Sequence, residues 1–253
     1  MAHEDERPDT VSGAGSRRSV LQGALAGVAA GLVSSAAPGR GQERTARVTV
    51  VPAFGSTHEP KPLPFRSSSL TGLSSGLIES HWSNNYGGSV RALNETNRRL
   101  AEALADPGLP AFTYNDLKRE HLMRTGSVVL HELYFDNLGG DGNASANLRS
   151  LIGRAFGSYD RWESEYRRIA AGLGGGCGWV VLGYNRQFEA LENYWMADHM
   201  HFPAATEPLL VMDMYEHSYH MDYGAATARY VDAFFANIQW DAVAARVEAT
   251  QRM

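Results

Sequence analysis

The strongest constraint on the fold is a helical pattern of apolar residues that fills most of the first half of the chain. The first run predicts a helix over 74–104, with a kink or a close contact at Gly87-Gly88. Its apolar residues at helical intervals are Leu77, Val90, Leu93, Leu100 and Leu104. A second helix is predicted from a cap at Asn115 or Asp116 to Leu138, where a glycine-rich segment stops it. Two consecutive helices of this kind predict a helical hairpin.

The second half of the chain is different, because strand-like runs interrupt the helical pattern. Ser158 is placed to cap a helix through Ile169. Two β-rich runs, 178–184 and 188–195, flank a turn-like segment at 185–187 and predict an antiparallel hairpin. The remaining predicted elements are a buried strand over 209–212 and helical runs from about 215 and over 227–248. This order predicts an α+β fold, with an N-terminal helical hairpin domain followed by an α/β domain with a small antiparallel sheet.

The domain boundaries follow from the same pattern. We expect the helical hairpin domain over 63–140 and the C-terminal α+β domain over 141–253. Residues 38–62 are rich in proline, glycine, threonine and arginine, and are expected to form a linker or an extended arm.

Residues 1–37 have the features of a twin-arginine signal peptide. Arg17-Arg18 is followed by a weakly apolar stretch over 23–33 and then by small residues that suit cleavage. This predicts export by the twin-arginine route to the periplasm or the extracellular space. The apolar stretch is too short to cross a hydrocarbon layer of roughly 30 Å, so no permanent membrane span is expected.

Charge and cysteine content exclude several other classes of protein. The formal net charge of −5 argues against a nucleic-acid groove, which needs concentrated Lys and Arg. The single cysteine, Cys177, excludes an intramolecular disulfide and a CxxC redox pair. Because it lies in an apolar segment of strand-like composition, Cys177 is predicted to be a small buried residue.

Four residues are candidates for metal binding. His81 and His131 lie on the two predicted helices, while Asp213 and His217 are four residues apart and would share one face of a helical turn. Imidazoles with a carboxylate suit iron or manganese. Residue type alone leaves other interpretations open, because a lone histidine on an apolar helix is more often a hydrogen-bonded core residue, and Asp213 with His217 can equally be a surface ion pair.

Six ordered segments carry a resemblance to a known family. They are LPF at 63–65, ESHWSNNYGGSV at 79–90, FGSYDRWESEY at 156–166, GCGWVVLGYN at 176–185, DMYEHSYHMDY at 213–223 and ARYVDAFFANIQW at 228–240. Together they resemble the iron/manganese superoxide dismutase family along nearly all of residues 62–248, and the segment at 213–223 is the most specific match.

This resemblance implies a metal site and a reaction. His81, His131, Asp213 and His217 stand at the family's four ligand positions, which implies one iron or manganese ion per subunit with water or hydroxide as a fifth ligand. The implied reaction is dismutation of superoxide to oxygen and hydrogen peroxide by one-electron cycling of the metal. Both metals use this set of ligands, so the sequence does not choose between them.

The resemblance also assigns residues around the metal. The spacing from Asn185 places His199 where the family has an outer glutamine, with Met200 or His201 as alternatives, and Trp179 is retained. An imidazole at this position can still hydrogen-bond to the metal-bound solvent.

Several positions depart from the family's pattern. Asn85 and Ser89 replace a histidine and a tyrosine that relay protons and narrow the entrance. Ser127 stands where many iron enzymes have a glutamine, and Tyr215 replaces a tryptophan. A shorter hydroxyl at Ser89 would need a bridging water, which predicts slower turnover.

Glu216 and His220 are the residues that the resemblance assigns to a subunit contact. Glu216 is retained, and in the family it bonds the ligand histidine of the opposite subunit, so a homodimer is expected. His220 and Asn85 replace both members of a second contact between subunits.

Two other functions compete with an active superoxide dismutase. The first is a metal-binding relative outside the cytoplasm that has little activity because its proton relay is broken. The second is a non-haem iron oxygenase with two histidines and one carboxylate, which ranks lower because a third histidine is present.

Overall fold

The structure is a computed structural model that describes residues 52–251 of the 253-residue chain. The predicted signal peptide and the predicted arm up to residue 51 lie outside the described residues. The helices are α1 (Ser75–Ser80), a π-helical segment (His81–Tyr86), α2 (Gly87–Leu104), α3 (Ala111–Asp136), α4 (Ala146–Phe156), α5 (Tyr159–Leu173), α6 (His220–Tyr223), α7 (Thr227–Ala236) and α8 (Trp240–Gln251). The strands are β1 (Trp179–Asn185), β2 (Ala190–Met196) and β3 (Thr206–Asp213), and three-residue 3₁₀ turns lie at Pro52–Phe54, Ser67–Ser69 and Glu216–Ser218.

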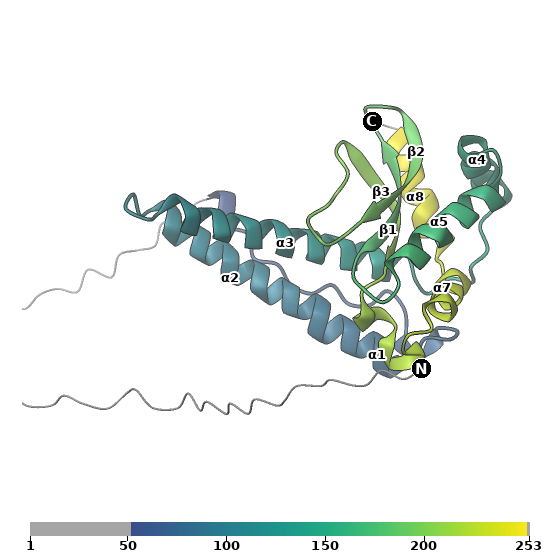
Figure 1. Cartoon of the computed structure of the whole chain (residues 1–253), viewed down its shortest axis with the longest axis horizontal. Helices are drawn as coiled ribbons and strands as arrows, with labels where there is room; N and C mark the ends of the chain where they lie inside the picture. The colour runs from purple at the N-terminus through teal and green to yellow at the C-terminus, as the bar shows by residue number, and fades with distance from the viewer. Residues whose placement is uncertain (1–51, 252–253) are drawn as a thin grey trace, which may run out of the picture. The chain divides into compact units, whose positions relative to one another are not determined.

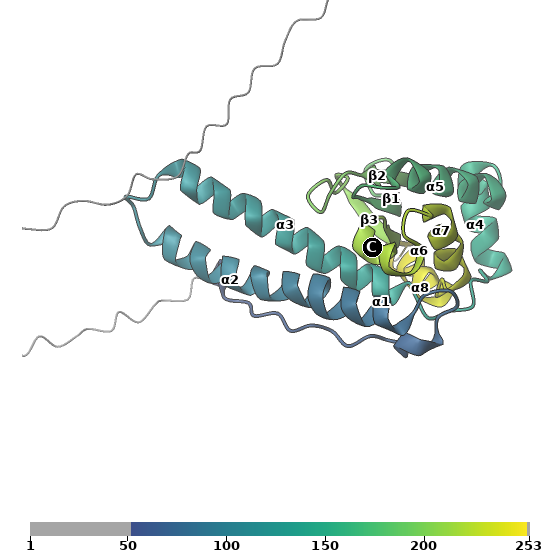
Figure 2. The same ribbon diagram turned by 60° about the horizontal axis from the view of Figure 1, so that its bottom comes forward.

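The predicted helical hairpin is confirmed, since α2 and α3 run side by side (Figures 1 and 2). The first helical run is continuous from α1 to α2, and Ser74 caps it by accepting a hydrogen bond from the Leu77 N–H at 3.2 Å. A π-helical segment ends directly before Gly87-Gly88, where the sequence predicts an irregularity. Such a segment widens the helix by one residue per hydrogen-bonded turn and is frequent at functional sites.

The predicted start of α3 is wrong, because the helix begins at Ala111 rather than after Asn115 or Asp116. Pro110 explains the earlier start. Its carbonyl accepts hydrogen bonds from the N–H groups of Thr113 and Tyr114, which closes the first turn. Proline has no N–H of its own to lose at this position.

The predicted antiparallel sheet is also confirmed. Strand β1 lies between β2 and β3 and pairs antiparallel with both. The turn between β1 and β2 is closed by Asn185, whose side-chain oxygen accepts the N–H groups of Gln187 and Phe188. Ser158 caps α5 as predicted, by accepting the Arg161 N–H at 3.1 Å. Helix α4 was not predicted, and the helical run expected over 227–248 is broken into α7 and α8.

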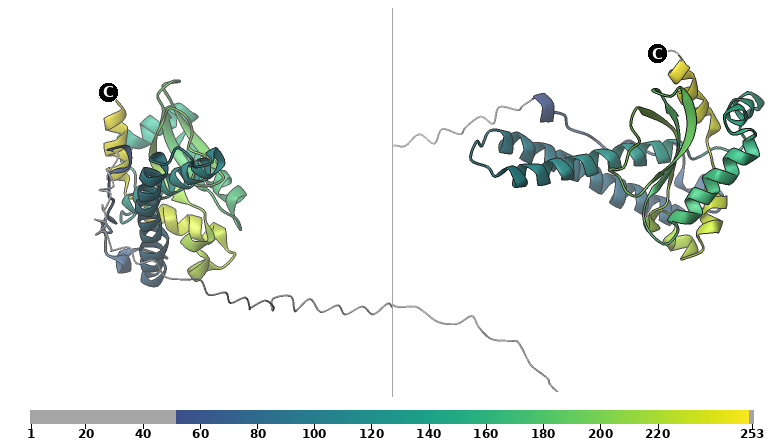
Figure 3. Two further views of the ribbon diagram at one scale, coloured as in Figure 1. Left: turned by 90° about the vertical axis from the view of Figure 1, so that its left-hand side faces the viewer. Right: turned by 45° about the horizontal axis from the view of Figure 1, so that its top comes forward.

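Packing of α3 and α5 on the sheet brings the two halves of the chain together (Figure 3). Helix α5 packs on β1, and α3 and α8 contact β3. Residues 179–182 and 209–213 are almost completely buried as a result. The contact between α3 and β3 places the C-terminal half of α3, with His131, beside the end of β3, where Asp213 lies.

A second link ties the start of the helical half to the C-terminal half. Asn237, after α7, binds the backbone of Thr71: its oxygen accepts the Thr71 N–H at 2.8 Å and its amide donates to the Thr71 carbonyl at 2.7 Å. Thr71 precedes α1, so this pair of bonds fixes the segment that leads into His81.

Two further findings concern single features. Within residues 52–251, no helix combines the length and the apolar character needed to cross a membrane. The prediction that Cys177 is buried is wrong: its side chain is exposed, and its thiol donates to the Ala197 carbonyl at 3.2 Å. Strand β1 begins only at Trp179, so Cys177 lies in the glycine-rich turn before the strand and not in the core.

Candidate metal centre

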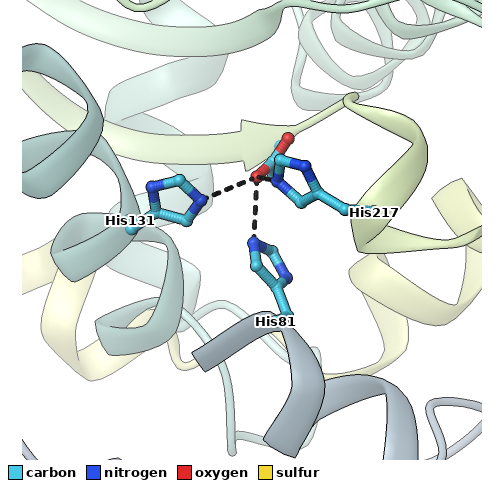
Figure 4. A group of neighbouring side chains, drawn as sticks. His81, His131 and His217 are labelled. Atoms are coloured by element: carbon cyan, nitrogen blue, oxygen red, sulfur yellow. Dashed lines mark hydrogen bonds and ion pairs between the residues drawn. The ribbon is translucent and has the colours of Figure 1, made fainter. Parts of the chain in front are cut away.

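Four side chains from distant parts of the chain converge on one point. One ligand atom each from His81, His131, Asp213 and His217 lies within 4.8 Å of the others. Figure 4 shows the three imidazoles pointing at a single carboxylate oxygen. The Nε2 atoms of His81 and His217 lie 3.1 Å from Asp213 Oδ2, and that of His131 lies 3.6 Å from it. The assignment of these atoms as metal ligands stays a prediction, and the geometry meets its first requirement.

Each of the four residues occupies a well-defined place in the fold. His81 opens the π-helical segment, and His131 lies in the buried part of α3. Asp213 is the last residue of β3, and His217 lies in the 3₁₀ turn that follows. Asp213 and His217 therefore do not share a helix, but the short turn brings them together all the same.

Neighbouring groups hold the carboxylate of Asp213 in a single orientation. Its Oδ1 accepts the Tyr215 N–H at 2.8 Å, which leaves Oδ2 facing the imidazoles. Its backbone carbonyl accepts hydrogen bonds from Ser218 Oγ at 3.0 Å and from the Tyr230 hydroxyl at 2.6 Å. The end of β3 is thus fixed on both its backbone and its side chain.

Unpaired nitrogen atoms show that this centre suits a cation. His131 Nδ1 donates to the Ser127 carbonyl at 2.7 Å, so its Nε2 is the nitrogen with the lone pair. His131 Nε2 and His81 Nε2 are buried and have no hydrogen-bond partner among the described residues. His81 Nε2 lies 3.1 Å from Asp213 Oδ2 but is not hydrogen-bonded to it. Buried nitrogens left unpaired are costly unless a ligand fills the space between them, and iron or manganese accepts this set of nitrogen and oxygen donors.

The electrostatics of the centre favour the protonation states that bind metal. Burial lowers the pKa of His81, and burial together with the neighbouring His81 lowers that of His131 well below 6.5. Burial alone would raise the pKa of Asp213, but His217 and His81 outweigh it and hold the pKa below its usual value. Neutral imidazoles and an ionised carboxylate are the forms that coordinate a metal ion.

Aromatic rings pack against the buried side of the centre. The His81 ring lies 5.0 Å from Phe135 and 5.1 Å from Tyr134, measured between ring centroids. The His131 ring lies 5.1 Å from that of Trp179, edge to face. Trp179 and Tyr134 are completely buried. Such surroundings strengthen the electrostatic interactions at the centre.

His199 is held beside the centre by two aromatic residues. Its Nδ1 accepts a hydrogen bond from Trp179 Nε1 at 3.0 Å, and its ring stacks on Tyr215 with centroids 4.7 Å apart. Burial lowers the pKa of His199, so the ring is neutral and carries its proton on Nε2. The alternative His201 is 59% exposed and pairs with Asp198, so it does not point at the centre.

A cleft of about 450 Å³ leads from the surface to the centre. It is lined by Asn84, Asn85, Gly88, Ser89, Ala92, Arg124, Ser127, His131, His199, Tyr215 and His217. Ser89 and Ser127 share a hydrogen bond of 2.8 Å, and Ser127 Oγ also lies 3.2 Å from His131 Nδ1.

Arg124 is the one lysine or arginine in that lining, and the sequence analysis missed it. Its Nε donates to Glu120 at 2.6 Å, and 31% of its side chain is exposed. Arg124 precedes His131 by seven residues, which is about two helical turns. That spacing was the available signal that both side chains share one face of α3.

Glu216 and His220 lie outside the cleft. Both are exposed in this single chain, and neither side chain has a hydrogen-bond or ion-pair partner among residues 52–251. Glu216 lies between Asp213 and His217 in the chain, and His220 follows His217 by three residues.

Comparison with known proteins agrees with this geometry. Residues 144–246 match the model of the C-terminal domain of iron/manganese superoxide dismutases. The chain is 50% identical to an iron superoxide dismutase of Cupriavidus metallidurans over 195 residues, which cover 77% of this chain and 98% of that protein. It is 34% identical to an iron superoxide dismutase of Aquifex pyrophilus over 201 residues, covering 77% and 92% of the two chains.

A manganese relative gives the same result. The chain is 32% identical to a manganese superoxide dismutase of Mycobacterium intracellulare over 180 residues, covering 70% of this chain and 86% of that protein. Identity at this level over most of both chains, together with the fold and the convergent histidines, establishes that the chain belongs to the iron/manganese superoxide dismutase family.

Proposed function

We propose that this protein dismutates superoxide to oxygen and hydrogen peroxide at a single iron or manganese ion. The observation that carries the proposal is the convergence of three imidazole nitrogens and one carboxylate oxygen within 4.8 Å, in a chain of this family. The residues that would hold the ion are His81, His131, Asp213 and His217. The relatives include proteins named for iron and proteins named for manganese, so both metals are candidates.

The overall reaction takes two superoxide ions and two protons to one oxygen and one hydrogen peroxide. A bound iron or manganese ion supplies the one-electron oxidation of the first superoxide and the one-electron reduction of the second. The side chains around the ion set the electrostatic environment of this electron transfer. Asp213 contributes a fixed negative charge, and the buried histidines contribute neutral donors. The aromatic wall leaves the cleft as the approach for a small anion.

Arg124 suits the capture of such an anion. Its guanidinium is the one permanent positive charge in the lining of the cleft, which otherwise consists of neutral side chains and histidines. A single cation in a narrow cleft attracts anions from solution and raises their local concentration.

Protons reach the second superoxide from the residues that line the cleft. His199 holds a proton at Nε2, because its Nδ1 is occupied by Trp179. The hydroxyls of Ser89 and Ser127 form a hydrogen-bonded pair in the wall beside His131. These hydroxyls are short, so water must complete the path from the solvent to the reacting oxygen atoms.

The test is the rate of superoxide consumption by metal-loaded protein, measured against two histidine variants on the same helix. His131→Ala removes a predicted ligand and is expected to abolish metal-dependent activity. His121→Ala is the matched control, because His121 lies on α3 outside the cluster and is expected to leave activity unchanged. A stoichiometrically metallated wild-type protein no faster than His131→Ala would favour the inactive metal-binding relative.

The dimer is a separate part of the proposal. Glu216 is exposed and unpaired in the described chain, and the neighbouring Met221 is 65% exposed. His217 is 24% exposed, and its Nδ1 makes no hydrogen bond within residues 52–251. A homodimer in which Glu216 accepts from Nδ1–H of the partner subunit's His217 would satisfy both groups.

Light scattering during size-exclusion chromatography tests the dimer. The mature protein is expected to elute with the mass of a dimer, and Glu216→Ala is expected to shift it toward monomer. Glu59→Ala removes another exposed carboxylate, on the arm, and serves as the control. A wild-type protein that is monomeric at micromolar concentration would contradict this part of the proposal.

Export is proposed from the sequence of residues 1–37 alone. The pattern around Arg17-Arg18, the apolar stretch and the small residues that follow support a twin-arginine signal and a periplasmic or extracellular mature protein. Cell fractionation tests it. The full chain is expected outside the cytoplasm, and replacement of both arginines by lysine is expected to retain it inside. Equal distribution of the two forms would argue against the signal.

A further inference from the structure

The backbone of α3 touches the backbone of the His199 loop at Gly126. A Cβ atom at position 126 would lie 1.8 Å from the carbonyl oxygen of His199 and 2.9 Å from its carbonyl carbon. Neither of these is the end of a flexible side chain that can swing away. Only glycine permits the observed approach. In the interior of α3 a glycine is less favourable for the helix than an alanine, so the helix alone gives no reason for it.

His199 lies in a loop outside the sheet, where the neighbouring Asp198 accepts a hydrogen bond from the Met200 N–H at 2.6 Å. Residues 197–205 pair with no strand, whereas the chain enters β3 at Thr206. Trp179 fixes the ring nitrogen Nδ1, and Tyr215 fixes the plane of the ring by stacking. The Tyr215 hydroxyl also hydrogen-bonds with the backbone of His199. Gly126 adds a restraint on the side of α3, because it sets how closely the His199 carbonyl approaches that helix and His131.

We propose that Gly126 is a positioning residue that sets the distance of the His199 imidazole from the metal centre, and so sets the reduction potential of the bound metal. The proposal rests on the proposed function. The His199 ring lies 5.8 Å from that of His131, between centroids, and its Nε2–H is the donor that Trp179 leaves free. Donors beside a metal site tune its potential, so a displaced donor changes the potential.

The experiment compares two glycine-to-alanine substitutions within helices. Gly126→Ala forces the unpaired loop away from α3. Gly172→Ala, in α5, meets nothing within 4 Å and is the matched control. The readout is the midpoint potential of the iron-loaded protein by mediated titration. Gly126→Ala is expected to change the reduced-to-oxidised ratio at fixed potential at least tenfold, which is 59 mV for one electron. Gly172→Ala is expected to leave it unchanged.

A second background shows whether the effect passes through His199. In His199→Ala protein, the added Gly126→Ala substitution is expected to produce no further change of potential. A folded Gly126→Ala protein with the wild-type potential overturns the proposal. So does a change of the same size in the absence of the His199 ring, because Gly126 would then act by another route.

A variant that leaves Gly126 in place covers the case in which Gly126→Ala does not fold. Pro203→Gly loosens the same loop but keeps its contact with α3, so the proposal expects an unchanged midpoint potential. A tenfold change in the ratio would overturn it. Failure of the proposed function is seen separately, because wild-type protein would then bind no redox metal or would bind it without consuming superoxide.

Discussion

The hydroxyl of Tyr230 offers a sharp test of how the fold supports the metal centre. Tyr230 is completely buried, and its hydroxyl donates to the Asp213 carbonyl at 2.6 Å and lies 3.3 Å from the Tyr134 hydroxyl. Tyr230→Phe removes both contacts. The Asp213 carbonyl keeps its bond from Ser218, so its loss is about 1 kcal/mol, and the buried Tyr134 hydroxyl left without this partner adds about 1 kcal/mol.

A total of about 2 kcal/mol predicts that the melting temperature of the metal-free protein falls by roughly 4–8 °C. Because the backbone of a predicted ligand is released, metal affinity is expected to fall about tenfold as well. Calorimetry measures the first effect, and competition with a chelator measures the second.

Tyr166→Phe is the matched control for this prediction. Tyr166 is equally buried, and its hydroxyl donates to the Val180 carbonyl at 2.9 Å, in the part of the sheet packed under α5. It is expected to lower stability by about 1 kcal/mol and to leave metal affinity unchanged. Equal losses of affinity in the two variants would refute the reasoning, because the hydroxyl of Tyr230 would then have no specific effect on Asp213.

Three further predictions concern charge, hydrogen bonding and pH. Arg124→Gln is expected to slow superoxide consumption several-fold at low ionic strength and much less near 0.15 M salt, where screening acts over about 8 Å. Arg119→Gln, outside the cleft lining, is the control. An Arg124→Gln rate equal to that of wild type at low salt would contradict the steering role. Trp179→Phe is expected to keep full metal content but to reduce turnover about fivefold. It removes the hydrogen bond from Trp179 to His199, worth about 1 kcal/mol, which fixes the His199 tautomer. Unchanged steady-state turnover would argue against this role of the hydrogen bond. Metal-free protein is expected to lose stability as the pH falls through about 6.5. Burial lowers the pKa of His81 and His131 in the folded chain, so the unfolded chain binds more protons at these residues. A urea midpoint that rises on acidification would contradict this expectation.

The hairpin and the sheet were predictable because their signals are local. The helical period of the first run and the strand-like composition around Asn185 specify elements with their own turns. Helix α4 was missed although the sequence carries its signals: Ser145 caps it, and Leu148, Leu151, Ile152 and Phe156 repeat at helical intervals. The error at Cys177 has a different origin. The strand-like composition includes Cys177 and Gly178, which precede β1. Gly178 has a φ of +139°, so the extended backbone of the strand begins only after it, at Trp179.

The sequence predicted the candidate ligands of the site but not the residues that position them. The six motifs identify the histidines and Asp213, and Asp213 with His217 already lie close along the chain. The roles of Gly126 and Tyr230 depend on which surfaces meet after folding. Gly126 gives no sign in the sequence that the His199 backbone will lie against it. Contacts of this kind join segments far apart in the chain, so no local pattern encodes them.

The most direct test of the central claim is the anomalous diffraction signal from crystals of iron-loaded protein. We predict one strong peak per chain, within bonding distance of Nε2 of His81, His131 and His217 and of Oδ2 of Asp213. A peak bonded to fewer than these four atoms, or located elsewhere on the chain, would contradict the account.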